Sequence, residues 1–243
     1  MTDTPFVLPG RIHEEELMDT EVVPQEDLVR CLRDLARVNL LSMGYRPTLR
    51  WLETAVAGRE RVSIVDIGCG YGDMLRRVER WATARGVEVD LLGIDLNPTT
   101  IRIAAEATPT GSAIRWEVMN LFDMPEDRQP DIVISSLFAH HLGDDELLGF
   151  VRWLDTRCRV GWFINDLHRH WISAWGLTLI FAIWPVHRFV RNDGPVSVRR
   201  AFVRDDLERV ATAAGLPDHD RTLRWWFPFR FGFGRLTRGA GPS

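Results

Sequence analysis

The segment Val65-Asp-Ile-Gly-Cys-Gly-Tyr-Gly72 decides the fold of this 243-residue chain. It ends a β-branched run that begins at Val62, and an amphipathic stretch follows it from Asp73. Glycines allow a sharp turn and a close approach of a ligand, and the first turn of a helix presents free N–H groups. We therefore predict a buried strand, a ligand-binding turn and a helix, which together open a parallel α/β sheet.

Strands and helices continue to alternate after this unit, with helices expected over 73–85, 98–107 and 144–156. Further strands are expected over 87–95, 114–119, 131–136 and 160–165, and a hairpin over 219–233. This rhythm predicts a Rossmann-like, doubly wound α/β sheet. We divide the chain into an N-terminal helical cap (1–57) and a main domain (58–243), with a helical cap insertion over 167–200 after the fifth strand.

The stretch 171–186 contains no charged residue. Its length falls short of the roughly 20 residues that a helix needs to cross a bilayer. We expect a buried or lid helix here, with a peripheral membrane contact as the alternative. The insertion is also rich in aromatic residues, which suits a flat or apolar ligand: Trp171, Trp175, Phe181, Trp184 and Phe189.

Composition excludes several classes of enzyme. All 30 basic side chains are arginine, so Schiff-base, pyridoxal-phosphate and P-loop chemistry, which need lysine, are absent. The three cysteines are widely spaced, which predicts no metal site and suits a reducing compartment. The net charge of −4 argues against nucleic acid as a partner. The N-terminus has neither a basic start nor an apolar run, so we expect a cytoplasmic protein.

Two acidic residues accompany the glycine turn. Asp66 stands inside the predicted strand, where an apolar residue is the structural default, and Asp95 ends the second strand. An acid at the end of the second strand can accept both hydroxyls of a ribose. The GxGxG spacing differs from the GxGxxG pattern of dinucleotide sites, which argues against an NAD-type oxidoreductase. The segments 120–125 and 135–142 follow the third and fourth strands.

Taken in this order, these four segments resemble the class I S-adenosylmethionine-dependent methyltransferases, over roughly residues 45–235. The pattern looks like the small-molecule branch related to quinone-biosynthesis methyltransferases. The segments SSLFAHHL, INDLHRH and NDGPVSVRRAF also resemble a bacterial subgroup associated with type III polyketide synthases, and hence with natural product biosynthesis. The resemblance implies a seven-stranded sheet with an antiparallel last strand, and S-adenosyl-L-methionine as cofactor, with S-adenosyl-L-homocysteine as product.

The resemblance also implies roles for individual residues. Asp66 would hold the methionine ammonium group, and Asp95 would hold the ribose. Asn120, where the family usually has aspartate, would accept the adenine amino group through its amide oxygen. The remaining predicted cofactor contacts are the Gly68, Cys69 and Gly70 turn, the side chain of Leu96, the backbone of Leu121, and Ser136.

Methyl transfer from a sulfonium requires alignment and, for a hydroxyl acceptor, a base. Histidines follow the fourth and fifth strands, where ligands bind in such sheets. The candidates for the base are His140, His141, Asp166, His168 and His170. Neighbours on a helix point about 100° apart, so at most one of His140 and His141 should face the pocket. We select His141 and His168. The predicted function is O-methylation of a lipophilic or phenolic small molecule. C-methylation of a phenol ring, an NAD-type oxidoreductase and a non-catalytic nucleoside-binding partner protein stay as alternatives, and the oligomeric state is left open.

Overall fold

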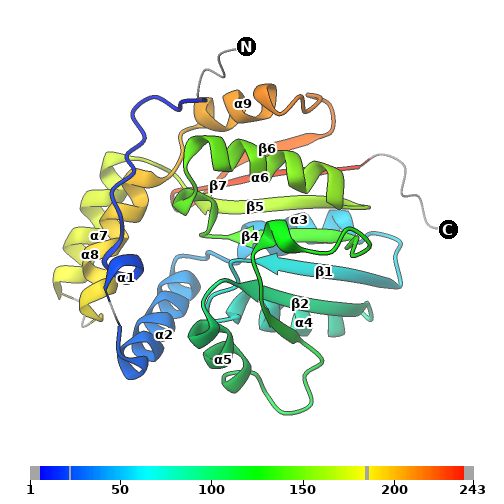
Figure 1. Cartoon of the computed structure of the whole chain (residues 1–243), viewed down its shortest axis with the longest axis horizontal. Coiled ribbons are helices and arrows are strands. Elements are labelled where there is room, and N and C mark those ends of the chain that lie inside the picture. The colour runs from blue at the N-terminus through cyan, green and yellow to red at the C-terminus, as the bar shows by residue number, and fades with distance from the viewer. Residues whose placement is uncertain (1–5, 22, 184–185, 238–243) are drawn as a thin grey trace.

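The computed structural model describes residues 6–21, 23–183 and 186–237. Within them, seven strands form one mixed sheet in the order β3-β2-β1-β4-β5-β7-β6 (Figure 1). The strands are β1 (Arg61–Ile67), β2 (Glu88–Asp95), β3 (Arg115–Val118), β4 (Ile132–Ser136), β5 (Gly161–Leu167), β6 (Arg221–Trp226) and β7 (Arg230–Leu236). β1 to β5 pair in parallel, and β7 is antiparallel to both neighbours. This confirms the predicted Rossmann-like sheet with an antiparallel last strand.

Successive side chains of the strands pack alternately into two hydrophobic cores, one on each face of the sheet. Ile64 of β1 faces a cluster with α3 (Arg46–Ala55) and α4 (Asp73–Thr83). Val65, the next residue, faces the opposite cluster with α6 (Asp144–Arg157) and α9 (Arg204–Ala213). This two-residue period is what a sheet covered on both faces requires. α5 (Pro98–Glu106) packs against β2 and β3.

Glycines allow β7 to lie close to β5. A Cβ atom at Gly232 would come within 2.5 Å of the Phe163 ring, and one at Gly234 would come within 2.5 Å of the Trp162 carbonyl oxygen. Both distances are far inside van der Waals contact, so only glycine fits. The final hairpin therefore closes the sheet edge beside the strand that carries Asp166.

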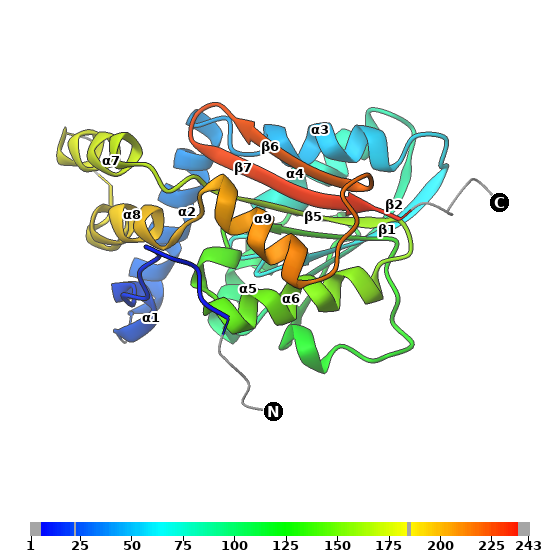
Figure 2. The same ribbon diagram turned by 90° about the horizontal axis from the view of Figure 1, so that it is seen from above.

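The cap stands at the carboxyl ends of the parallel strands. It consists of α1 (Leu17–Thr20), α2 (Gln25–Leu41), α7 (Trp171–Ile183) and α8 (Arg188–Arg200), which lie together at one end of the sheet (Figures 1 and 2). α3, which we grouped with the cap in 1–57, instead covers a face of the sheet, because its apolar stripe joins the core beside α4. Two single-turn helices, η1 (Leu121–Asp123) and η2 (Ala139–His141), follow β3 and β4.

The aromatic residues of the insertion divide into two groups. Phe181 and Phe189 are buried in a core with α2, whereas Trp171 and Trp175 are 70% and 66% exposed. These two tryptophans therefore lie on the side of α7 that faces away from this core. Trp184 lies outside the described residues. Across the described part of the chain, no helix combines the length and apolarity that crossing a bilayer requires.

Candidate active site

The glycine turn has the conformation that its sequence predicts. Gly68, Gly70 and Gly72 all have positive φ, at 66°, 51° and 73°. A Cβ at Gly72 would overlap the ring of Trp116, whereas the side of Gly70 that would carry a Cβ has no atom within 4 Å. The turn is therefore packed at one glycine and open at another, which leaves room for a ligand against its backbone.

Asp66 is a buried carboxyl with an unsatisfied oxygen. It is 2% exposed, and its Oδ1 has no hydrogen-bond partner among the described residues. Burial raises the pKa of Asp66 well above its usual range, and the nearby Asp73 and Asp95 carboxylates add to this. An unpaired buried carboxyl is costly unless a cation or donor completes it. This position is therefore suited to a positively charged group of a ligand.

Asp95 ends β2 beside the same turn. Its Oδ2 accepts a hydrogen bond from the Gly70 N–H at 3.1 Å, and its Oδ1 accepts one from the Asn97 N–H at 3.0 Å. Burial raises the pKa of Asp95, although these backbone donors oppose the shift. Each carboxylate oxygen keeps a further lone pair for a ligand hydroxyl. Leu96 follows with 66% of its surface exposed, an apolar side chain available to cover a planar group.

The other predicted cofactor contacts lie after β3, in the glycine turn and at the end of β4. Asn120 is exposed after β3, and its Oδ1 caps η1 by accepting the Phe122 N–H at 3.0 Å. That oxygen can accept one more hydrogen bond, while Leu121 is buried beneath it. Cys69 is buried within the turn, and burial raises its thiol pKa well above the usual range. Ser136 ends β4 half-buried, before Leu137 in the strained left-handed region at φ 57°.

His140 is the most constrained histidine of the site. It is 2% exposed, and its Nδ1 lies 2.7 Å from Asp166 Oδ1, while its backbone N–H donates to Asp166 Oδ2 at 3.2 Å. Burial alone would lower the pKa of His140, but the carboxylates of Asp166 and Glu16 raise it to about 9. His140 is therefore a buried imidazolium at neutral pH, held in one orientation.

Glu16 joins this pair from the cap. Its Oε1 lies 3.7 Å from Nε2 of His140 and 3.9 Å from Nε2 of His141. It also accepts the Ser197 hydroxyl at 2.6 Å. Burial opposes ionisation, but His140, His141 and Ser197 lower the pKa of Glu16 to about 2. His141 is the accessible member of the group, with 29% of its side chain exposed, and it lies near enough to Asp95 to lower the pKa of that carboxyl.

Glu16, His140 and His141 place three metal-ligating atoms within 4.8 Å of one another. The spacing of the three cysteines predicts no metal site, and it carries no information on these three residues. Carboxylate and imidazolium also satisfy each other without an ion, because their charges are opposite. Sequence reasoning missed Glu16 because the run Glu14–Glu16 is typical of a solvated surface.

Two buried arginines hold the histidine loop in place. Arg11 binds Asp144 at 2.8 Å and donates to the His140 and Leu142 carbonyl oxygens at 2.7 Å each. Arg200 donates to the carbonyl oxygens of His140 at 3.2 Å and His141 at 2.8 Å. The N-terminal segment and α8 are thereby fastened to the loop after β4, and this fixes Glu16 above it.

His168 lies apart from that group. Its Nδ1 accepts the Trp225 indole N–H at 3.1 Å, and its ring packs edge-on against Phe231 at 4.8 Å. Burial lowers the pKa of His168, and His170 lowers it further. The structure therefore brings His141 near Asp95, whereas His168 contacts the β6–β7 hairpin.

Arg230 is a second residue that the sequence did not single out. It is 3% exposed, donates to Asn39 Oδ1 at 2.7 Å, and its Nη1 has no partner among the described residues. Burial lowers its pKa to about 10, although Asp166, Tyr45 and Asp73 oppose the shift. Asp166, which binds His140, therefore also acts on Arg230, and an anionic ligand oxygen would complete the donors of this arginine.

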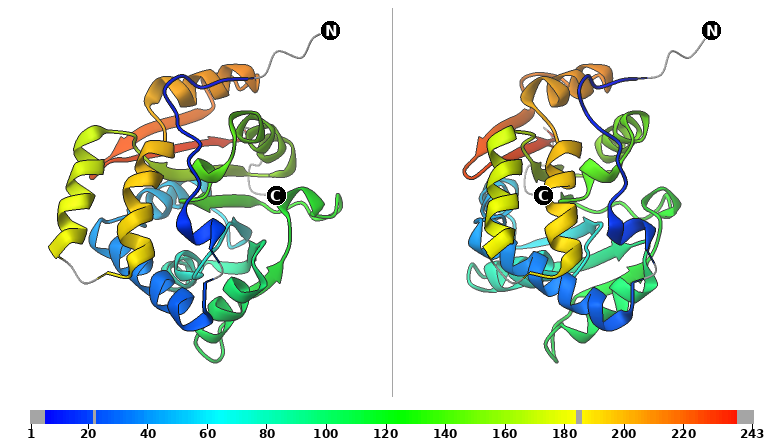
Figure 3. Two further views of the ribbon diagram at one scale, coloured as in Figure 1. Left: turned by 60° about the vertical axis from the view of Figure 1, so that its left-hand side comes forward. Right: turned by 90° about the vertical axis from the view of Figure 1, so that its left-hand side faces the viewer.

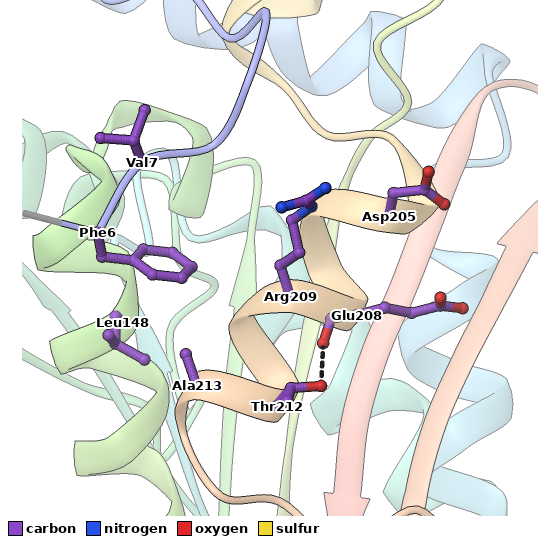
Figure 4. Close-up of a pocket in the computed structure, with 8 residues that line it drawn as sticks. All are labelled: Phe6, Val7, Leu148, Asp205, Glu208, Arg209, Thr212 and Ala213. Carbon is purple, nitrogen blue, oxygen red and sulfur yellow. Dashed lines mark hydrogen bonds between the residues drawn. The ribbon is translucent and has the colours of Figure 1, made fainter.

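A separate depression lies between the N-terminal segment, α6 and α9 (Figure 4). None of the predicted site residues lines it. Its lining residues are Phe6, Val7, Leu148, Asp205, Glu208, Arg209, Thr212 and Ala213. Because neither the glycine turn nor the histidines contribute to it, we assign it no part in the site.

Comparison with known proteins agrees with this geometry. Residues 64–161 match the family model described as a methyltransferase domain. The matched segment runs from β1 to the start of β5 and contains Asp66, Asp95, His140 and His141. Among curated proteins, none matches the sequence of this chain.

Several solved structures share the fold. The plantazolicin methyltransferase in complex with SAH is 13% identical with a TM-score of 0.62, over 88% of this chain and 95% of that one. The magnesium protoporphyrin IX methyltransferase from Synechocystis PCC 6803 with bound SAH is 15% identical with a TM-score of 0.53, over 80% and 82%. Human N-acetylserotonin methyltransferase in complex with SAM is 13% identical with a TM-score of 0.62, over 92% and 59%. At these identities the likeness establishes a common fold.

Proposed function

We propose that this chain is an S-adenosylmethionine-dependent methyltransferase of the class I, small-molecule branch, and that it methylates an oxygen of a lipophilic or phenolic acceptor. The observation that carries the proposal is that two sets of residues lie close together at one edge of the sheet. The ligand-ready turn with Asp66 and Asp95 lies there, and so does the Glu16–His140–His141 cluster, close enough for His141 to act on the pKa of Asp95.

The residues present fit the cofactor. S-adenosylmethionine supplies an activated methyl group on a sulfonium when bound. The unpaired Oδ1 of Asp66 would take the ammonium group, and Asp95 the ribose hydroxyls. Leu96 would cover the adenine, and the open side of Gly70 leaves space for the methionine portion. Ser136 and the amide of Asn120 would border the same ligand.

His141 is the proposed base. It is the partly exposed histidine of the cluster, and Glu16 orients its Nε2 and would stabilise the imidazolium that forms when a hydroxyl proton is taken. His140 is already charged at neutral pH, so its part is to hold Asp166 and Glu16 and to favour an oxyanion nearby. Arg230, with its unpartnered Nη1, would add to that positive potential.

The test is methylation of a panel of alkyl and aryl phenols with isotope-labelled S-adenosylmethionine, followed by product NMR. We expect label on oxygen, and a loss of about 10²–10⁴-fold in kcat for His141→Asn, the usual contribution of a general base. His219→Asn is the matched control, since His219 lies exposed beside Asp220 away from the cluster. Label on a ring carbon would replace O-methylation by C-methylation. Failure to bind S-adenosylhomocysteine would refute the cofactor assignment.

A further inference from the structure

α7 has two unlike faces. Leu177 and Phe181 pack into the core shared with α2 and α8. Trp171, Trp175 and Leu179 recur every four residues on the outer face and are 65–70% exposed. Ile172 and Ile180 lie beside them and are also exposed. Residues four apart share a helix face, so these side chains form one continuous apolar surface rather than scattered exposures.

The tip of the β6–β7 hairpin extends this surface. Trp225 and Phe227 are exposed there, and Phe229 lies between the hairpin and the start of α7. Its ring is 6.5 Å from Trp225 and 5.5 Å from His170, and His170 in turn stacks on Trp171 at 6.0 Å. The hairpin tip and α7 lie side by side in Figures 2 and 3. We call the exposed residues of these two elements the aromatic face: Trp171, Ile172, Trp175, Leu179, Ile180, Trp225 and Phe227.

The two segments that form the aromatic face contribute basic but no acidic side chains, although Arg188 pairs with Glu21 at 2.6 Å and Arg169 with Asp206 at 2.8 Å. Residues 167–192 and 221–237 contain no aspartate or glutamate, and their charged side chains are arginines and histidines. Next to the hairpin, Arg230 binds Asn39 at the end of α2, where Leu40 and Leu41 are exposed. Leu40 also lines a groove between α2 and α4, where five arginines outnumber one acidic residue, Asp73: Arg33, Arg37, Arg76, Arg77 and Arg80.

These observations select one kind of partner. Tryptophan and arginine are the side chains that suit a membrane interface, where an apolar body is buried and a polar end stays among headgroups. A two-fold contact with a second copy would place this face against itself, and its arginines would then meet arginines. α7 is too short to span a bilayer, so its orientation would be parallel to the surface.

We propose that the aromatic face and its adjoining arginines dock the protein on the surface of a membrane that contains anionic lipids. The tryptophans and isoleucines would enter the headgroup region, and the arginines would bind lipid phosphates and carboxylates. Docking goes beyond the methylation chemistry and does not depend on which acceptor atom is methylated. It would place the edge that carries the site beside a lipophilic acceptor dissolved in the bilayer.

The test is co-sedimentation of the full chain with vesicles of phosphatidylcholine alone and of phosphatidylcholine mixed with phosphatidylserine. We expect binding to the mixed vesicles, weaker binding at high salt, and a loss of about tenfold or more in affinity for each of Trp171→Ser and Trp175→Ser. Val7→Ser is the control, because Val7 is 63% exposed but lies on the N-terminal segment beside α6.

Binding of S-adenosylhomocysteine by calorimetry should be the same in all three variants, which separates docking from the methyltransferase site. The proposal would be overturned if the wild-type protein did not bind the mixed vesicles. So would vesicle binding that survives both tryptophan substitutions, or a dimer that those substitutions dissociate while vesicle binding is unchanged.

Discussion

Raising the pH through the pKa of His140 should weaken the fold. In the folded protein burial opposes the charged imidazole, but Asp166 and Glu16 raise its pKa from 6.5 to about 9. Between these values the native state binds a proton that the unfolded state has lost, so the free energy of unfolding falls as pH rises. A shift of this size corresponds to about 3 kcal/mol, fully present below pH 6.5 and lost as pH passes about 9.

The assay is urea denaturation followed by tryptophan fluorescence at pH 6 and above pH 9, on wild type and on the double variant His140→Gln/Asp166→Asn. Replacing both partners by amides leaves no member of this pair as an unpaired buried charge. Folding also raises the pKa values of the buried cysteines, and burial raises that of Cys31 to about 12. Their effect is common to both proteins and cancels in the difference.

We expect wild type to lose about 3 kcal/mol more than the double variant across this window. Imidazole NMR gives an independent reading, because the His140 ring should titrate near pH 9. Parallel pH profiles for the two proteins, or a His140 resonance that titrates near 6.5, would refute the reasoning that two carboxylates hold this histidine charged.

Three further substitutions test the cofactor edge. Gly72→Ala should destabilise the fold by about 1–3 kcal/mol in thermal denaturation, because a Cβ would overlap Trp116 and φ is positive; an unchanged melting temperature would contradict the packing described. Leu96→Ala should leave stability within about 0.5 kcal/mol, since Leu96 is exposed, yet weaken S-adenosylhomocysteine binding in calorimetry; equal affinity would remove Leu96 from the site. Asp66→Asn should weaken the same binding by about tenfold or more without lowering stability, because it removes a buried, unsatisfied carboxyl; a large loss of stability would show that Asp66 is structural.

Local features were predictable, because short segments determine them. The positive φ angles of the turn follow from its glycines, and Asp66 and Asp95 fall at the ends of strands whose β-branched composition is visible in the sequence. The doubly wound sheet followed from the helix-strand rhythm, and its antiparallel last strand followed from the resemblance to known methyltransferases. These inferences needed no knowledge of which distant segments would meet.

The histidine cluster was only partly predictable, because it depends on distant contacts. The expected fifth strand ended at Asn165, but β5 continues to Leu167, so Asp166 is fixed within the sheet. The chain beyond β5 then meets the hairpin, since the His168 N–H donates to the Phe229 carbonyl oxygen at 2.8 Å. No sequence pattern near His168 predicts its contact with Phe229. Likewise, no pattern near Glu16 predicts its contact with His140.

The N-terminal segment is part of the site rather than an addition to it. Arg11 and Arg200 donate hydrogen bonds to carbonyl oxygens of the loop that carries His140 and His141. Asp193 accepts hydrogen bonds from the Leu17 and Met18 N–H groups at 3.0 and 3.1 Å. These contacts fix Glu16 where it can balance a buried imidazolium, and a buried charge in turn requires that fixed partner. The cap and the Glu16–His140–His141 cluster therefore depend on each other, so the charge balance of this cluster is set by elements outside the sheet.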